Sequence, residues 1–347
     1  ANGEIDIASL HAQDSTGLLA RIDRAVVWDI PLTTPFRGIT RRDGVLLHGP
    51  GGWGEVAPFW DYGSEASAPW LASGLSQALG NSLLPRYRET ISVNVTVPEV
   101  GAQEAAELVR ASGARTAKVK VSGSSSKRSA DLERLEAVRS ALGRSGKVRI
   151  DVNGAWDLDT ARENLPLMDR AAGGLEYAEQ PCATVYDLAD LRRAVDVPIA
   201  ADESIRLSAN PLEIVHRRAA DVAILKVAPL GGVHRAMDMA ERLGLPTVVS
   251  SALDTSVGIM AGATLAFSLP SLNHACGLGT TYLLTQDVVD PSVRPSNGTL
   301  RLDAAAPVSE RLLDEVKAGP YLTKHWQTRL LHLAGALHAR RQREARD

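Results

Sequence analysis

Cysteine is scarce in this sequence. Only two of its 347 residues are cysteines, Cys182 and Cys276, and they lie far apart without a Cys-x-x-Cys pair. Disulfide-stapled domains and cysteine zinc sites need more cysteines at closer spacing. The eight histidines are scattered and form no His-Glu-x-x-His motif. These absences exclude a disulfide framework and the common zinc motifs, and they favour a reducing, cytoplasmic location.

Aromatic residues and excess positive charge are also lacking. Aromatics make up 4% of the chain, and the formal net charge is -3. A nucleic-acid binder normally carries a basic excess and stacking platforms, so we expect no nucleic-acid partner. No apolar run approaches the ~20 residues of a membrane helix. The longest candidate, Val257–Leu269, is rich in Gly and Ala and indicates a tightly packed internal helix, so we expect no membrane partner either.

From about residue 91, short apolar runs alternate with amphipathic segments. This alternation is typical of βαβ units and a parallel sheet. Eight strands in about 190 residues favour a closed (β/α) barrel of the TIM-like, modified (β/α)7β type over an open sheet. The predicted strands are Ile91–Val97, Thr116–Val121, Val148–Val152, Gly174–Glu179, Val197–Ala201, Val222–Val227, Thr247–Ser251 and Leu272–Gly277.

The rest of the chain does not follow this strand–helix alternation. Residues 21–92 predict a small α+β capping domain, to which 296–325 return through a strand at Thr299–Leu302. Residues 93–295 form the predicted barrel, and 326–347 a C-terminal helix and tail. Residues 1–20 contain no apolar secretory signal and are treated as a leader of uncertain origin.

One segment matches a phosphate-binding motif only formally. Gly49-Pro50-Gly51-Gly52-Trp53-Gly54 formally matches Gly-x-Gly-x-x-Gly. A dinucleotide site needs that loop to open a helix, whereas here it runs into Glu55-Val56-Ala57, which predicts another strand. We therefore interpret the motif as a tight hairpin.

Charged residues end five successive predicted strands. They are Lys118 and Lys120, Asp151 with Asn153, Glu179, Asp202, and Lys226, each group one βα repeat after the last. In a barrel, functional groups come from the carboxyl ends of several strands. Residues two apart on a strand share a face, so Lys118 and Lys120 can both point into the barrel mouth.

This set of residues suits one chemistry. Three carboxylates on adjacent strands form an oxygen-only site appropriate for Mg²⁺, with Mn²⁺ as an alternative. Flanking lysines can remove a proton α to a carboxylate and stabilise the resulting enediolate by charge. Each element alone also has an ordinary interpretation, such as a solvated Lys-x-Lys strand or a helix N-cap at Asp202.

The order Lys-x-Lys, Asp-x-Asn, Glu-Gln-Pro, Asp-Glu-Ser, Lys resembles the enolase superfamily, specifically its muconate-lactonising subgroup, over about residues 21–325. The resemblance implies a capped barrel, with Asp151, Glu179 and Asp202 as metal ligands. It further implies Lys120 as the catalytic base and Lys226 as the second catalytic lysine across the substrate.

Three activities within that subgroup compete. The segments Lys226–Gly232, Ser250–Ser256 and Ala275–Thr280 resemble the actinobacterial o-succinylbenzoate synthase family. That resemblance implies loss of water from 2-succinyl-6-hydroxy-2,4-cyclohexadiene-1-carboxylate, a step of menaquinone biosynthesis. An N-succinylamino-acid racemase needs the same two lysines and stays open. A dipeptide epimerase is disfavoured, because Cys276–Gly279 stands where that group carries Asp-x-Asp.

Substrate contacts are less defined by the sequence. We expect a small-molecule carboxylate substrate, contacted by Lys118, Asn153, Ser250 and Gly277 at the strand ends. Three arginines of the predicted cap, Arg37, Arg41 and Arg42, are candidates for a succinyl carboxylate, since Arg suits bidentate recognition. A barrel that retains its shape without catalysis is the non-enzymatic alternative. The sequence predicts no oligomeric state.

Overall fold

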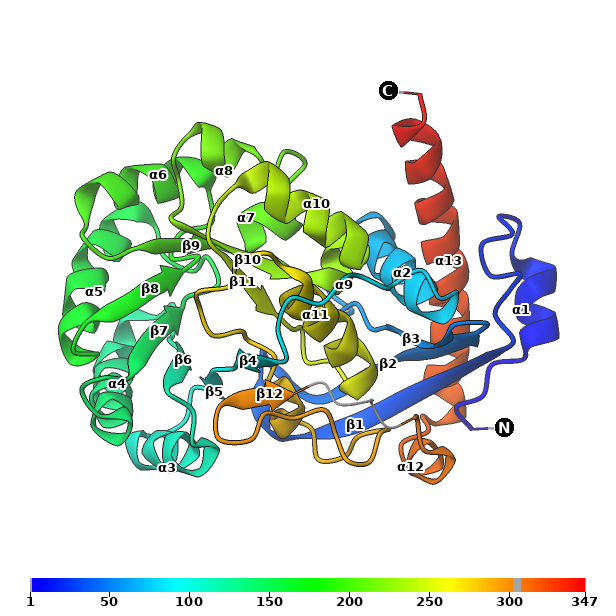
Figure 1. The fold of residues 1–347 in the computed structure, drawn as a ribbon, viewed down its shortest axis with the longest axis horizontal. Helices are drawn as coiled ribbons and strands as arrows, with labels where there is room; N and C mark the ends of the chain where they lie inside the picture. Colours follow the sequence, from blue (N-terminus) through cyan, green and yellow to red (C-terminus); the bar gives the residue numbers. More distant parts are fainter. Residues whose placement is uncertain (1, 302–306, 347) are drawn as a thin grey trace.

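The computed structural model describes residues 2–301 and 307–346. Figure 1 shows strands ringed by helices beside a smaller N-terminal unit, along which the long C-terminal helix runs. This is the predicted α/β architecture, a parallel barrel with an α+β cap. Within the described residues, no helix is both long and apolar enough to cross a bilayer.

The N-terminal unit is built on an antiparallel sheet with the order β1-β2-β3. Its elements are β1 (Arg24–Phe36), β2 (Ile39–Gly49), β3 (Gly52–Val56) and α2 (Ser64–Ala78). Gly49 pairs with Gly52 across a two-residue turn, which confirms the hairpin interpretation of the glycine motif. A Cβ on Gly54 would lie 1.9 Å from the Gly74 carbonyl oxygen, so glycine is required where β3 meets α2.

Both ends of the chain pack onto this unit. Helices α1 (Ile7–Gln13), α12 (Glu310–Glu315) and α13 (Pro320–Glu344) come from the terminal segments. Leu10, Leu19 and Trp326 are fully buried in one apolar cluster with residues of β1 and β2. Backbone bonds also join Val316 and Ala318 to β1. Residues 2–20, which the sequence predicts as a leader, thus contribute to the core of the unit.

The barrel contains seven parallel strands in sequential order. They are β5 (Val95–Val97), β6 (Thr116–Lys120), β7 (Lys147–Asp151), β8 (Leu175–Glu179), β9 (Ile199–Ala201), β10 (Val222–Lys226) and β11 (Thr247–Ser250). Cys276 and Gly277 close the circle, because Gly277 bridges to Ser250 of β11 and Cys276 to Val93. The eighth predicted strand is therefore reduced to a few paired residues.

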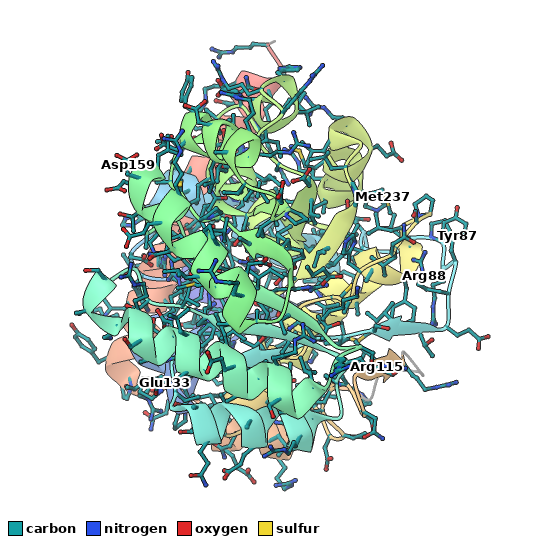
Figure 2. The ribbon with its side chains drawn as sticks, turned by 90° about the vertical axis from the view of Figure 1, so that its left-hand side faces the viewer. Tyr87, Arg88, Arg115, Glu133, Asp159 and Met237 are labelled. Atoms are coloured by element: carbon teal, nitrogen blue, oxygen red, sulfur yellow. The ribbon has the colours of Figure 1, made fainter. Side chains whose placement is uncertain are left out.

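Helices cover the outside of the barrel. They are α3 (Ala102–Ser112), α4 (Arg128–Leu142), α5 (Leu158–Ala171), α6 (Val185–Ala194), α8 (Glu213–His216), α10 (Val233–Leu243) and α11 (Ser256–Ser268). Two single-turn helices, α7 (Glu203–Arg206) and α9 (Val227–Leu230), instead lie at the carboxyl ends of β9 and β10, and short 3₁₀ turns span Ser125–Lys127 and Thr280–Leu283. Figure 2 shows Glu133, Asp159 and Met237 on helices α4, α5 and α10 around the strands. Asp157 caps α5 by accepting from the Thr160 amide at 2.7 Å, which fixes where that helix begins.

Two predicted elements differ in detail. The run Ile91–Val97 is split: β4 (Thr90–Ser92) pairs antiparallel with β12 (Thr299–Arg301), and only β5 joins the barrel. The returning strand therefore contacts the entry to the barrel rather than the β1-β2-β3 sheet; Leu302, its predicted end, lies outside the described residues. The physical reason is that β1 takes its outer partners from the chain ends, at Glu4 and Lys317.

Candidate active site

Strand register brings the predicted charged residues to one height of the barrel. Lys120 is the neighbour of Asp151, and Asp151 is the neighbour of Glu179. On the far side, Lys226 of β10 is paired with Ser250 of β11. Paired residues of parallel strands point to the same face. The charged strand ends therefore converge at the carboxyl end of the barrel.

Each lysine is held by carboxylates. Lys120 Nζ lies 2.5 Å from Asp151 Oδ2 and 2.8 Å from Asn153 Oδ1. Lys226 Nζ lies 2.7 Å from Asp202 Oδ2. The two lysines thus extend from different strands toward the centre, each with its own acidic partner.

Lys118 lies deeper than Lys120. It is almost fully buried, and its Nζ lies 3.3 Å from Asp151 Oδ2 and 3.2 Å from Glu179 Oε2. Although burial opposes its charge, Glu179 and Asp151 raise the pKa of Lys118 above its ordinary value. One ammonium group therefore bridges two of the predicted metal ligands.

The pKa values of the three carboxylates depend on one another as well as on the nearby cationic side chains. Burial and the charge of Asp151 raise the pKa of Glu179 to about 7, against the effect of Lys118. Burial disfavours ionised Asp151, but Lys120 and Lys118 prevail and lower its pKa below the ordinary range. Burial likewise opposes ionised Asp202, yet Arg206 and Lys226 lower its pKa to about 2.

The donor set fits a hard divalent cation. Asp151, Glu179 and Asp202 are at most 1% exposed, and all their donors are oxygens. Asp151 and Asp202 both raise the pKa of Glu179 because the negative charges repel each other. A cation bound among these carboxylates would relieve that repulsion. Across residues 2–301 and 307–346, however, no three His, Cys, Asp or Glu side chains are arranged as a ready metal site. A shared ion stays a prediction for these three residues.

A small cavity of about 50 Å³ lies over the charged cluster. Seven of the nine predicted site residues line it: Lys118, Lys120, Asp151, Asn153, Lys226, Ser250 and Gly277. Glu179 and Asp202 are buried behind it. Phe36 and Arg37 of the N-terminal unit also line it, so the cavity lies between cap and barrel.

Ser250 and Gly277 lie side by side in this cavity. A Cβ on Gly277 would lie 2.6 Å from Ser250 Oγ. The short eighth strand can therefore approach β11 only because residue 277 has no side chain.

The three candidate arginines have different surroundings. Arg37 reaches the cavity, where its guanidinium lies 3.9 Å from the centre of the Phe59 ring. Arg41 pairs with Asp29 at the surface. Arg42 is buried and donates to backbone carbonyls, so it is not available to a substrate carboxylate.

Two further residues shape the site and were not singled out in the sequence. Arg206 lines the cavity and lies 3.0 Å from Asp202 Oδ1; its i, i+4 spacing from Asp202 is the signal that could have identified it. Gln180 is fully buried, and its Oε1 accepts from the amides of Asp202 and Ser204. It thereby ties the end of β8 to the end of β9.

The sequence matches the family model described as "Enolase C-terminal domain-like" over residues 101–307. A second model, "Enolase N-terminal domain-like", matches residues 27–78. The chain belongs to the enolase superfamily. The matched ranges correspond to the barrel and to the β1-β2-β3 unit, which agrees with the resemblance seen in the sequence.

Curated members of this superfamily are similar over most of their length. An o-succinylbenzoate synthase from Thermobifida fusca is 53% identical over 304 residues, covering 87% of this chain and 93% of the relative. One from Mycobacterium tuberculosis is 46% identical, covering 90% and 94%. Among solved structures, the N-succinyl Arg/Lys racemase from Bacillus cereus has a TM-score of 0.72 at 21% identity, covering 86% of this chain and 98% of its own. That last likeness concerns the fold alone.

Proposed function

We propose that this protein is an o-succinylbenzoate synthase. It removes water from 2-succinyl-6-hydroxy-2,4-cyclohexadiene-1-carboxylate to give 2-succinylbenzoate, as a cytoplasmic lyase of menaquinone biosynthesis. The observation that carries the proposal is 53% identity to a synthase over nearly its whole length. It is combined with two lysines that line one cavity and three buried carboxylates beside them, of which Asp151 also lines the cavity.

Lys120 is the proposed base. Its Nζ lines the cavity at the carboxyl end of β6 and is oriented by Asp151 and Asn153. In its neutral form it removes the proton α to the substrate carboxylate, and the ammonium then formed donates that proton to the departing hydroxide. One side chain therefore performs both proton transfers.

Lys226 is the proposed electrostatic partner. It reaches the same cavity from β10 and carries a positive charge next to Asp202. A fixed ammonium in a buried site stabilises the negative charge that develops on the enediolate oxygens. Lys118 has a different role, because its ammonium compensates the buried negative charges of Asp151 and Glu179.

Asp151, Glu179 and Asp202 are the proposed ligands of Mg²⁺, with Mn²⁺ as a substitute. When bound, a divalent ion supplies positive charge that stabilises carboxylate and enediolate oxygens. Ser250, Gly277 and Asn153 are proposed substrate contacts at the cavity wall. We propose a division into a barrel from 93–295 and a cap from 21–92, to which helices α1, α12 and α13 of the chain ends also belong.

The test follows the absorbance of the cyclohexadiene as purified protein and Mg²⁺ are added. Loss of absorbance with formation of 2-succinylbenzoate supports the synthase, and an inert protein would indicate the silent-barrel alternative. Two lysines at one cavity also suit a racemase, so exchange of the α-proton of N-succinyl amino acids with solvent deuterium is measured in parallel. Exchange without dehydration would assign the racemase instead.

A further inference from the structure

The loop between β11 and α11, residues 251–255, is held by side chains from the cap. Arg42 of β2 is 2% exposed, and it donates from Nε to the Leu253 carbonyl at 3.3 Å and from Nη2 to the Ala252 carbonyl at 3.2 Å. The same Nη2 also donates to Ala57 within the cap. A buried guanidinium is costly unless its donors are used. Here they fix two successive peptide groups of the barrel loop.

Glu55 of β3 holds the other end of the loop. Both its carboxylate oxygens lie 3.2 Å from the amide of Thr255, and the Thr255 hydroxyl donates to Oε2. A Cβ on Gly258 would lie 2.6 Å from Glu55 Oε1, so glycine in the first turn of α11 permits this approach. Gln77 of α2 adds a third link, donating to the Val257 carbonyl at 2.9 Å.

Leu253, in the middle of the loop, has an unfavourable backbone conformation. Its φ is +57°, in the left-handed region that residues other than Gly and Asn rarely adopt. Such a conformation persists where surrounding contacts impose it. Its carbonyl is bound by Arg42, and its side chain is buried against Phe59 and Trp70. Cap side chains therefore bind its carbonyl and share its apolar cluster, to which Leu283 also belongs.

The held loop is also a wall of the catalytic cavity. Four consecutive residues, Ser250 to Leu253, line it together with Lys120 and Lys226. The position of this wall relative to both lysines thus depends on the cap side chains that bind the loop.

We propose that Arg42 and Glu55 are positioning residues for the dehydration: they hold Leu253 and its neighbours as the wall that places the substrate ring between Lys120 and Lys226. This inference rests on the proposed function. Neither side chain lines the catalytic cavity. Arg42 and Glu55 therefore act on the substrate through the loop. Displacing this wall would remove contacts with the bound ring, which raises KM and Kd.

A matched pair at Thr255 tests the proposal with little change in volume. Thr255→Val removes a hydroxyl that donates to Glu55 and also accepts from the Val257 amide at the start of α11, whereas Thr255→Ser retains both bonds. We expect Thr255→Val to raise the KM for the cyclohexadiene and the Kd for 2-succinylbenzoate by about tenfold. Thr255→Ser should stay close to wild type. Arg42→Met is expected to act in the same direction. The control is Arg24→Met, which loses ion pairs with Glu4 and Glu310 and a contact with the Trp53 ring but no bond to the loop.

Hydrogen exchange of the peptide spanning 250–257 provides a readout independent of turnover. Faster exchange there in Thr255→Val, together with weaker KM and Kd, supports positioning. A lower melting temperature with unchanged KM and Kd in both Thr255→Val and Arg42→Met would overturn it and leave a purely structural role. Absence of turnover in the wild-type protein would refute the proposed function. The positioning role is judged separately, because 2-succinylbenzoate binding and hydrogen exchange of the loop are measured without catalysis.

Discussion

Lys120 and Asp151 face each other across neighbouring strands, with Nζ and Oδ2 2.5 Å apart. Asp151 is 1% exposed, whereas Lys120 is only partly buried and lines the cavity. The carboxylate therefore anchors the ammonium from below and leaves the lysine directed to the space where substrate would bind. Lys226 and Asp202 repeat the arrangement on the other side.

Replacing the proposed base removes catalysis but retains the fold. We expect Lys120→Ala to lower kcat for dehydration by about 10²- to 10⁴-fold, because no other group takes over proton transfer. Circular dichroism and Mg²⁺ titration should match wild type. The control is Lys127→Ala, a surface lysine with 64% of its side chain exposed. Normal turnover in Lys120→Ala would contradict the assignment of the base.

Metal removal tests the proposed ligands. Dialysis against a chelator is expected to abolish dehydration, and added Mg²⁺ to restore it, since three buried carboxylates need a compensating cation to bind an anionic substrate. Asp202→Asn should weaken Mg²⁺ binding in calorimetry. Unchanged turnover in the chelator-treated protein would show that these carboxylates serve another purpose.

Lys118 is predicted to matter for stability through charge. Lys118→Met leaves the buried carboxylates of Asp151 and Glu179 without their shared ammonium, and we expect a loss of about 3–5 kcal/mol in the free energy of unfolding. Adding Glu179→Gln removes one of those charges and should recover part of the loss. Urea unfolding of both single variants and the double variant measures this coupling. A double variant as unstable as the sum of the singles would argue against it.

Glu55 gives a pH dependence of stability. Burial and the charge of Asp254 raise its pKa well above the ordinary value of 4.5. A group with a raised pKa in the folded state favours folding below its unfolded pKa, and that contribution is lost as pH rises through the folded pKa. The stability of Glu55→Gln relative to wild type should therefore increase with pH above 4.5, by up to about 1.4 kcal/mol per pH unit. Urea unfolding at several pH values measures the difference. A difference independent of pH would contradict the raised pKa.

Much of the fold follows from local pattern. The barrel strands β6 to β11 were predictable because each is a short apolar run bounded by helical segments, and their order follows from the right-handed βα repeat. The difference arose where a strand pairs with a segment distant in the sequence. The run Ile91–Val97 is continuous in sequence, but its first half pairs with β12, a partner that only the folded chain supplies.

The sequence by itself indicated which residues are proposed to carry the chemistry, because charged side chains at the ends of buried strands are costly without partners and recur once per βα repeat. The order of those residues resembles the enolase superfamily, and the family matches confirm that resemblance. Only the tertiary structure decided what surrounds them: that Lys118 bridges Asp151 and Glu179, that Arg206 reaches Asp202, and that Arg42 and Glu55 reach from the cap to the loop at Leu253. Those contacts join residues up to about 200 positions apart, and no local pattern encodes which distant segments meet.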